Sequence, residues 1–389
     1  MRQLRRDQEA DTHRYLGVIA TAALALLLLQ VLVPWSDGEL DIHHISTGRG
    51  NATLFVLPDG TSLLVDAGAR PASPGFPEAP SRPSDARRPG EWIARYIART
   101  LPEPKLDYVL VTHFHDDHMG GLADVVSALE IDKLLDRGWP DYDYPRPLDF
   151  ERVRAYRRVA EKLDVEAFEP GSNDQIVLKR RPYPKFEIQN LTANGVYWSG
   201  QGDETREQFP ALDTLADEDY PSENMSSLSF RLRYGAFDYY TGGDLTGIPN
   251  VGHPDWQNME KAIADAFGPV DVHVVNHHGS IDSASPEFLA ALKPRVHIIP
   301  AHSATHPAPS VLKRLLSERA YEGPRDVFIL QFREPTKAAI GPRANQVKSG
   351  AGHVIVRVAP GGGSYRVFVV SDADESGTVL AEHGPYRSQ

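Results

Sequence analysis

Four side chains of the kinds that bind metals lie close together near residue 115 of this 389-residue chain. Imidazole nitrogens and carboxylate oxygens together suit Zn, Mn or Fe. A polar loop with incidental histidines rarely brings these ligand types together in such a short pattern. The pattern His-x-His-x-Asp-His therefore predicts a metal-binding loop. Its members are His113, His115, Asp117 and His118.

Each stretch that carries candidate ligands follows a run of residues typical of a strand. The apolar run 106–111 precedes the first cluster, and the run 237–240 precedes Gly242, Gly243 and Asp244. The run 272–276 leads into His277 and His278, which are followed by a small-residue turn. Because a rigid sheet aims the residues at its strand ends, we expect these side chains to converge on one metal centre.

The order of these motifs resembles that of the metallo-β-lactamase superfamily. The series consists of the turn at 65–68, the His-x-His-x-Asp-His pattern, the Gly243-Asp244 turn and the His-His-Gly-Ser turn at 277–280. The stretches 48–68, 224–235 and 283–289, with His306 and Pro307, narrow the resemblance to the hydrolase domain of ComEC-type competence proteins, which act in DNA uptake. The resemblance covers most of residues 40–370, apart from a middle insertion.

The resemblance implies an α/β fold, namely a four-layer αββα sandwich, and a centre with two Zn or Mn ions. His113 and His115 would hold the first metal, Asp117 and His118 the second, and Asp244 would bridge the two. His277 would complete the second site, because the first histidine of comparable turns is usually the ligand. Further candidates beside the metals, as orienting groups or substrate contacts, are Asp66, Asn224 and His278.

One departure from the superfamily concerns the first metal. Many members supply a further histidine shortly before the bridging aspartate, but this chain has no histidine between His118 and Asp244. Asn224 and Ser227 occupy the matching stretch. The first site is therefore expected to be weaker or to hold Mn in place of Zn, and an enzyme with a single metal is an alternative.

The N-terminal region predicts a membrane anchor. Residues 16–33 form a run of 18 residues without charge, which is at the lower limit for a spanning helix. Four arginines precede it, so residues 1–15 are expected in the cytoplasm, residues 16–35 in the membrane and the domain outside. A cleaved signal segment followed by secretion is the alternative.

Composition and turn signals divide the rest of the chain into a domain, an insertion and a tail. We expect one hydrolase domain at 39–372, with an insertion at 136–222 beside the active site and a C-terminal tail at 373–389. A glycine-rich turn between two alternating runs predicts a closing hairpin over 352–371. The chain has no cysteine, which excludes disulfides.

Net charge bears on the substrate. A nucleic-acid binder normally carries a basic footprint, whereas this chain has a formal net charge of −12. Nucleic acid as a partner is therefore not supported by charge, although ComEC-like motifs favour a phosphodiester. The predicted function is metal-dependent hydrolysis by a phosphodiesterase or nuclease.

Alternatives to that function remain open. One is an esterase, lactonase or β-lactamase-like hydrolase of a small molecule, and another is a non-catalytic metal-binding module. The predicted catalytic residues are Asp117, at the metals, and His306, which would bind phosphate or protonate the leaving oxygen. His302 is a weaker candidate for that role. Nothing in the sequence indicates the oligomeric state.

Overall fold

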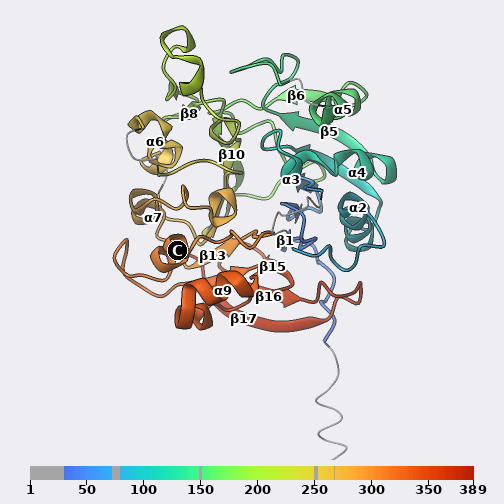
Figure 1. Cartoon of the computed structure of the whole chain (residues 1–389). Helices are drawn as coiled ribbons and strands as arrows, with labels where there is room; N and C mark the ends of the chain where they lie inside the picture. The colour runs from blue at the N-terminus through green and yellow to red at the C-terminus, as the bar shows by residue number, and fades with distance from the viewer. Residues whose placement is uncertain (1–29, 72–78, 149–150, 249–252, 267) are drawn as a thin grey trace, which may run out of the picture.

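The computed structural model describes residues 30–71, 79–148, 151–248, 253–266 and 268–389, and these residues form two β-sheets packed face to face (Figure 1). The nine-stranded sheet has, in spatial order, β17 (Val379–Arg387), β16 (Ser364–Val370), β15 (His353–Val358), β1 (Leu40–His44), β2 (Thr53–Val56), β3 (Ser62–Val65), β4 (Lys105–Leu110), β5 (Glu130–Asp136) and β6 (Val165–Ala167). The eight-stranded sheet has β14 (Asp326–Ile329), β13 (Val296–Ile299), β12 (Val272–Val274), β11 (Phe237–Thr241), β10 (Ser229–Tyr234), β7 (Phe186–Ala193), β8 (Val196–Trp198) and β9 (Thr205–Glu207).

Helices cover the outer face of each sheet. The nine-stranded sheet is flanked by α2 (Pro89–Thr100), α3 (Asp116–Met119), α4 (Leu122–Ala128) and α5 (Glu151–Ala160). The eight-stranded sheet is flanked by α6 (Met259–Ala264), α7 (Pro286–Leu292), α8 (Pro309–Leu315) and α9 (Glu334–Ile340). Short 3-10 turns are η1 (Leu212–Thr214), η2 (Asp217–Asp219), η3 (Asn224–Ser226), η4 (Asp255–Gln257), η5 (Asn276–Gly279) and η6 (Gly341–Gln346). The predicted αββα layering is confirmed.

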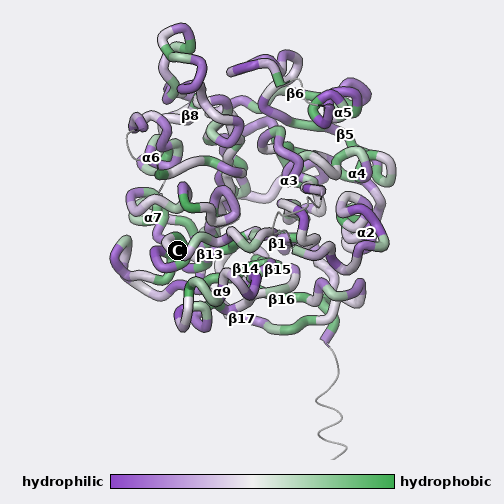
Figure 2. The backbone as a smooth tube through the Cα atoms, viewed as in Figure 1, coloured by the Kyte–Doolittle hydropathy of each residue, from purple (hydrophilic) through white to green (hydrophobic). Residues whose placement is uncertain are grey.

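Apolar burial holds the layers together. Between the sheets, the ring of Phe55 lies 5.9 Å from that of Phe230 and 5.5 Å from that of Tyr239. On the outside, Ile93 and Ile97 of α2 are fully buried against the first sheet. Figure 2 shows hydrophilic residues along α2 and α5, as expected of helices with one face in solvent.

Parallel pairing places the chemistry at one edge of each sheet. β3, β4 and β5 run parallel in the first sheet, and β11 to β14 run parallel in the second. The carboxyl ends of parallel strands lie at the same edge, which is where open α/β sheets bind ligands. Asp66 and His113 follow β3 and β4, while Asp244, His278 and His302 follow β11, β12 and β13.

The predicted insertion at 136–222 is in part integral to the sandwich. β6 pairs with β5 in the first sheet, and β7 lies between β10 and β8 in the second. The strand pattern of β7 is hidden because its polar residues Gln189, Asn190 and Thr192 are buried and satisfied by hydrogen bonds. The aromatic residues Trp139 and Tyr142 of this segment pack onto the first-sheet core.

The prediction of a C-terminal tail at 373–389 is wrong. β17 pairs along β16 and forms the edge of the nine-stranded sheet, next to the predicted hairpin of β15 and β16. Its register shifts break the alternating pattern that would have identified it. The predicted anchor falls outside the described residues as far as residue 29, and no helix in the described ranges is long and apolar enough to cross a bilayer.

Candidate metal centre

The metal-binding loop leaves β4 and turns directly into α3. His113 and His118 are almost fully buried, Asp117 is 6% exposed, and His115 points to the exposed side. The chain approaches this loop closely from the β3 side. A Cβ atom on Gly68 would lie 2.1 Å from the backbone oxygen of Asp117, so only glycine fits there.

Asp66 fixes the orientation of this loop. Its carboxylate accepts hydrogen bonds from the backbone N–H of Thr112 at 2.8 Å and from Nδ2 of Asn51 at 2.9 Å. It also lies 2.7 Å from Nδ1 of His118. Since a carboxylate only accepts, Nδ1 of His118 carries a proton, and Nε2 is the nitrogen left to bind a metal. This is the position expected for Asp66 beside a metal ligand.

Asp244 reaches the same centre from the opposite sheet. It follows Gly243, which adopts a φ of 54° and whose added Cβ would lie 2.8 Å from the side chain of Thr112. The backbone N–H of Asp244 donates to Oγ of Ser227 at 3.1 Å. The glycine therefore allows the β11 loop to approach the loop that follows β4.

His277 and His278 occupy a strained turn after β12. Both residues have positive φ, 49° for His277 and 53° for His278, which is uncommon for side chains other than glycine. The turn is held where the backbone N–H of His277 donates to the carbonyl of Gly243 at 3.0 Å. This conformation directs the two adjacent rings differently, so that His278 is buried and His277 is partly exposed.

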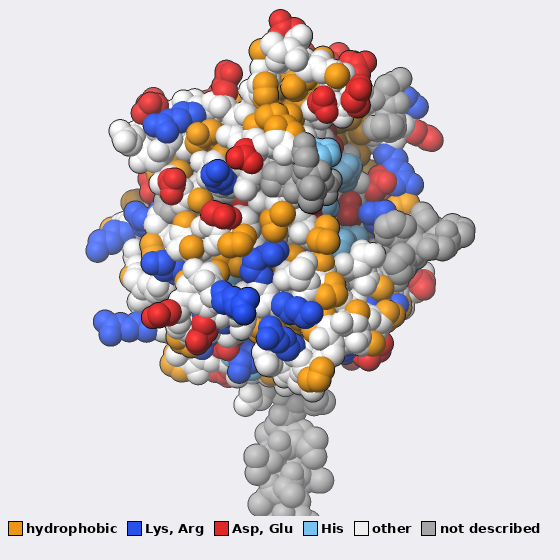
Figure 3. Space-filling model, turned by 60° about the vertical axis from the view of Figure 1, so that its left-hand side comes forward, with side chains coloured by type: hydrophobic (Ala, Val, Ile, Leu, Met, Phe, Trp, Pro, Cys, Tyr) orange, Lys and Arg blue, Asp and Glu red, His pale blue; other side chains and the backbone are white. Residues whose placement is uncertain are grey.

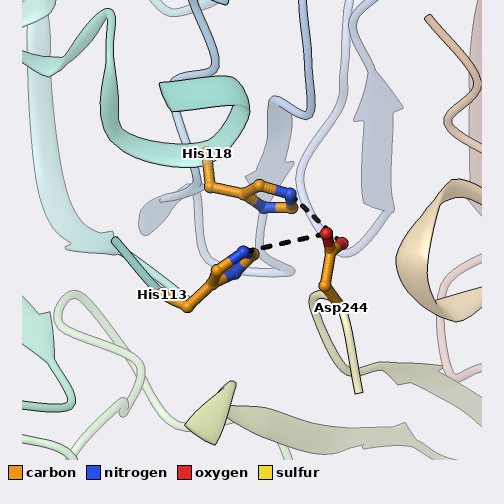
Figure 4. A group of neighbouring side chains, drawn as sticks. All are labelled: His113, His118 and Asp244. Atoms are coloured by element: carbon orange, nitrogen blue, oxygen red, sulfur yellow. Dashed lines mark ion pairs between the residues drawn. The ribbon is translucent and has the colours of Figure 1, made fainter. Parts of the chain in front are cut away.

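Two groups of buried candidate ligands lie next to each other, and each group has members from both sheets. In the first, Nε2 of His118 and Nε2 of His113 lie 3.1 and 3.7 Å from the carboxylate oxygens of Asp244 (Figure 4). In the second, Asp117 lies with His278 and His302, with 3.1 Å between Oδ2 of Asp117 and Nε2 of His302. Within each group the ligand atoms all lie within 4.8 Å of one another.

The protonation pattern of these rings fits metal ions. Nδ1 of His278 lies 3.0 Å from the carbonyl of Pro300 and donates to it, so Nε2 is the nitrogen that is directed at the other ligands and could bind a metal. Nε2 of His278 and Nε2 of His118 are 3.1 Å apart, and Oδ1 of Asp244 lies within 3.4 Å of both. Against the effect of burial, the carboxylates raise the pKa of both rings, so this group of atoms attracts positive charge, and the same nitrogen and oxygen donors fit a divalent metal.

Electrostatics keep the two carboxylates and His113 in their metal-binding forms, whereas, against the effect of burial, the carboxylates raise the pKa of His118 and of His278 in the metal-free protein. Burial raises the pKa of the Asp117 carboxyl, but hydrogen bonds from His278 and His302 outweigh it and hold this pKa well below its usual range. Asp244 is shifted the same way by His118 against burial. Burial, together with neighbouring His118, holds the pKa of His113 well below its usual range, so this imidazole is neutral.

The structure groups some of the predicted ligands differently from the grouping that the family resemblance implies. Nδ1 of His277 lies 2.8 Å from Asp282, and its Nε2 lies 3.2 Å from Nδ2 of Asn224 and 3.8 Å from Asp244. Since the amide of Asn224 can donate to that nitrogen, His277 has protein partners at both ring nitrogens. His278, which was expected beside the metals, lies in the second ligand group, and His277 is a member of neither group. His118 lies with His113, and not with Asp117 as expected.

The remaining predicted residues lie at the edge of the centre. Nδ1 of His115 is 3.0 Å from Nε2 of His113, so His115 can join the first group from its exposed side. The ring of His306 stacks on that of His278, with centroids 5.2 Å apart. Burial, and then the charge of His278, holds the pKa of His306 well below its usual range.

His302, predicted only as a weaker candidate for binding phosphate, lies in the second ligand group. It follows the apolar run of β13 after Pro300 and Ala301, which repeats the arrangement of a strand followed by a ligand seen after β4 and β12. That repeat is a signal that could have identified it. The choice of His278 over His277 had no such signal, because it depends on the positive φ values of the turn.

A comparison with protein families decides the assignment. Residues 45–302 match the family described as Metallo-beta-lactamase superfamily, which is more than half of the chain. The chain belongs to the metallo-β-lactamase superfamily. With its buried histidine and aspartate clusters, it is a metal-dependent hydrolase of that fold.

The individual proteins to which this chain is similar share little of its sequence. ComE operon protein 3 of Bacillus subtilis (strain 168) is 24% identical over 308 residues, which is 77% of this chain but only 33% of that protein. The match to the structure of the diiron β-hydroxylase CmlA from Streptomyces venezuelae covers 84% of this chain and 55% of CmlA. The sequence identity is 14%, and the TM-score is 0.41. The match to the subclass B3 metallo-β-lactamase MEM-A1 from a soil metagenome covers 81% of this chain and 90% of MEM-A1. The sequence identity is 13%, and the TM-score is 0.34.

Proposed function

We propose that this protein hydrolyses phosphodiester bonds with two divalent metals, on the extracytoplasmic side of a membrane to which residues 16–35 anchor it. The observation that carries the dinuclear proposal is the pair of facing ligand groups, one with His113 and His118 and the other with His278 and His302. Asp244 lies within contact distance of rings from both groups. Zn and Mn both suit these ligands.

The protein side chains position the metals and the substrate. Bound divalent metals supply Lewis acidity and lower the pKa of water to make a nucleophile. Asp66 keeps Nε2 of His118 directed into the centre, and the carbonyl of Pro300 does the same for His278. Asp117 contributes a carboxylate whose low pKa keeps it ionised at neutral pH.

A cation at the edge of the centre supports an anionic substrate. Nη1 of Arg70 lies 3.6 Å from Oδ2 of Asp117, and its side chain is 34% exposed. A guanidinium at that place can hold a phosphate oxygen while the ester bond is cleaved. His306, neutral and stacked beside His278, can donate a hydrogen bond to the phosphate or the leaving oxygen. The ComEC-like motifs of the sequence also favour a phosphodiester such as DNA.

Hydrolysis of bis(p-nitrophenyl) phosphate by the full chain in detergent, with Mn or Zn added, tests this function. We expect turnover that requires metal and that falls at least about 100-fold in Asp244→Asn, because one oxygen of the central carboxylate is replaced by an amide. Asp265→Asn makes the same change at an exposed position and should keep full activity. Full turnover in Asp244→Asn would exclude the dinuclear proposal.

The alternative is a hydrolase of a small ester, lactone or β-lactam, and the net charge of −12 favours it over a nucleic-acid substrate. The same preparation is therefore assayed with p-nitrophenyl acetate and with a chromogenic cephalosporin. Metal-dependent cleavage of these compounds without cleavage of phosphodiesters would replace the proposed function with the alternative.

A further inference from the structure

A basic pocket lies on the second-sheet side of the molecule, outside the metal ligands. Its volume is approximately 690 Å³, and it is bordered by α7, α8 and η6. Four of its lining side chains are cations, and Ser317 adds a hydroxyl. The four cations are Lys313, Arg314, Arg319 and Arg343. This concentration of positive charge contrasts with the net charge of −12 of the whole chain.

Three of these cations have no carboxylate partner within the ranges that the structure describes. Lys313, Arg319 and Arg343 are exposed, and none of them forms an ion pair with a described residue. A second basic stretch behaves differently. Arg180 pairs with Asp107, and Arg181 pairs with Asp37, so that stretch is largely neutralised.

The fourth cation, Arg314, shapes the pocket. Its Nε donates to the carbonyl of Ala284 at 2.7 Å, and its Nη2 donates to the carbonyl of Ser283 at 3.1 Å. It is therefore fixed in place while its charge remains at the pocket. Ser283 and Ala284 directly follow Asp282, whose Oδ1 lies 2.8 Å from Nδ1 of His277. The contacts of Arg314 therefore connect the pocket to the turn that carries His277 and His278.

We propose that this pocket binds a small molecule that carries a diphosphate or another cluster of phosphate charges. Guanidinium groups match the geometry of phosphate oxygens, and several unpaired cations in one pocket favour a ligand with more than one negative charge. The volume lies in the range of small-ligand pockets. Figure 3 shows that Lys and Arg side chains gather on the lower half of one face while Asp and Glu occupy its top, so a long polyanion would meet repulsion beyond the basic area.

Isothermal titration of the full chain in detergent with inorganic pyrophosphate tests the pocket. The double variant Arg319→Ala/Arg343→Ala should weaken the dissociation constant at least tenfold. Arg181→Gln removes an exposed arginine elsewhere and should leave it within twofold. Asp244→Asn should also retain the pocket's binding, which separates it from binding of pyrophosphate at the metal centre and makes the result independent of the proposed function.

Each other outcome overturns the inference. It fails if wild-type protein does not bind pyrophosphate, if Arg181→Gln weakens binding as much as the double variant, or if binding vanishes in Asp244→Asn. Binding of a single-stranded oligonucleotide without binding of pyrophosphate would assign the pocket to a nucleic-acid strand and contradict a small-molecule site. Thermal unfolding of each variant verifies that the substitutions leave the fold intact.

Discussion

At the scale of single residues, the two adjacent histidines after β12 have different partners. Nδ1 of His278 meets a backbone carbonyl and its Nε2 faces other ligands, whereas His277 lies between Asp282 and Asn224. The ring of His278 therefore directs one nitrogen at the candidate ligands, whereas His277 has partners outside the two ligand groups at both nitrogens. The sequence alone could place both rings near the centre but could not choose between them.

Substitution of each histidine separates these roles. His278→Ala should reduce the bound metal from two ions to about one per chain, because the group with Asp117 loses a ligand. His277→Ala should retain both ions. Metal content of the purified variants, measured by plasma mass spectrometry, checks this. The opposite result would restore the ligand assignment that the family resemblance implies.

Protons should compete with the metals at His278. Burial lowers the pKa of His278, but Asp244 and Asp117 outweigh it and raise the pKa to about 9 in the metal-free protein. Below that pH a proton must leave before a metal binds, so affinity should rise with pH up to about 9. Calorimetric titration of metal in buffers of different ionisation enthalpy should show proton release at pH 7. No release would show that the ring is already neutral.

At the scale of elements, a buried ion pair connects the chain after β5 to the metal loop. The guanidinium of Arg137, whose side chain is fully buried, pairs with Glu223. Oε1 of Glu223 accepts from the backbone N–H of Phe114, between the first two histidines of the loop, at 2.8 Å. The ring of Phe114 lies under Arg137 at 4.7 Å. The segment at 136–222 therefore supports the centre although it supplies none of the identified ligands.

Breaking that pair should destabilise the fold strongly. Arg137→Met leaves the Glu223 carboxylate buried without its partner, which is expected to cost about 3–5 kcal/mol in the free energy of unfolding. Arg366→Met breaks an exposed pair with Glu382 and should cost less than about 1 kcal/mol. Urea denaturation of both variants makes the comparison. Equal effects would mean that solvent reaches Arg137.

The sequence predicted some elements well and others poorly, for physical reasons. The runs 106–111, 237–240 and 272–276 predicted β4, β11 and β12, because short strand-like runs identify such strands from local composition alone. β7 was missed because its buried side chains are polar, and β17 because register shifts and its glycine break alternation. A buried polar side chain is stable only when it has a hydrogen-bond partner, and that partner often lies far along the chain. A local sequence pattern does not reveal such a partner.

At the scale of the whole molecule, the candidate metal ligands come from both halves of the sandwich. His113 and His118 follow strands of the first sheet, and Asp244 and His278 follow strands of the second. Removing metal should therefore lower global stability, by about 2.7 kcal/mol relative to a free metal concentration 100 times the dissociation constant. Differential scanning calorimetry with and without EDTA measures this. In Asp244→Asn the difference should shrink, and an equal difference there would point to metal bound elsewhere.

The distribution of ligands along the chain also has a consequence for biosynthesis. The ligands extend from His113 to His302, so most of the polypeptide must be synthesised before the last of them exists. The ions are then acquired in the compartment where folding is completed, and protein affinities for divalent metals follow a common order. The ion that the enzyme carries is consequently set by the supply of that compartment as well as by its own side chains.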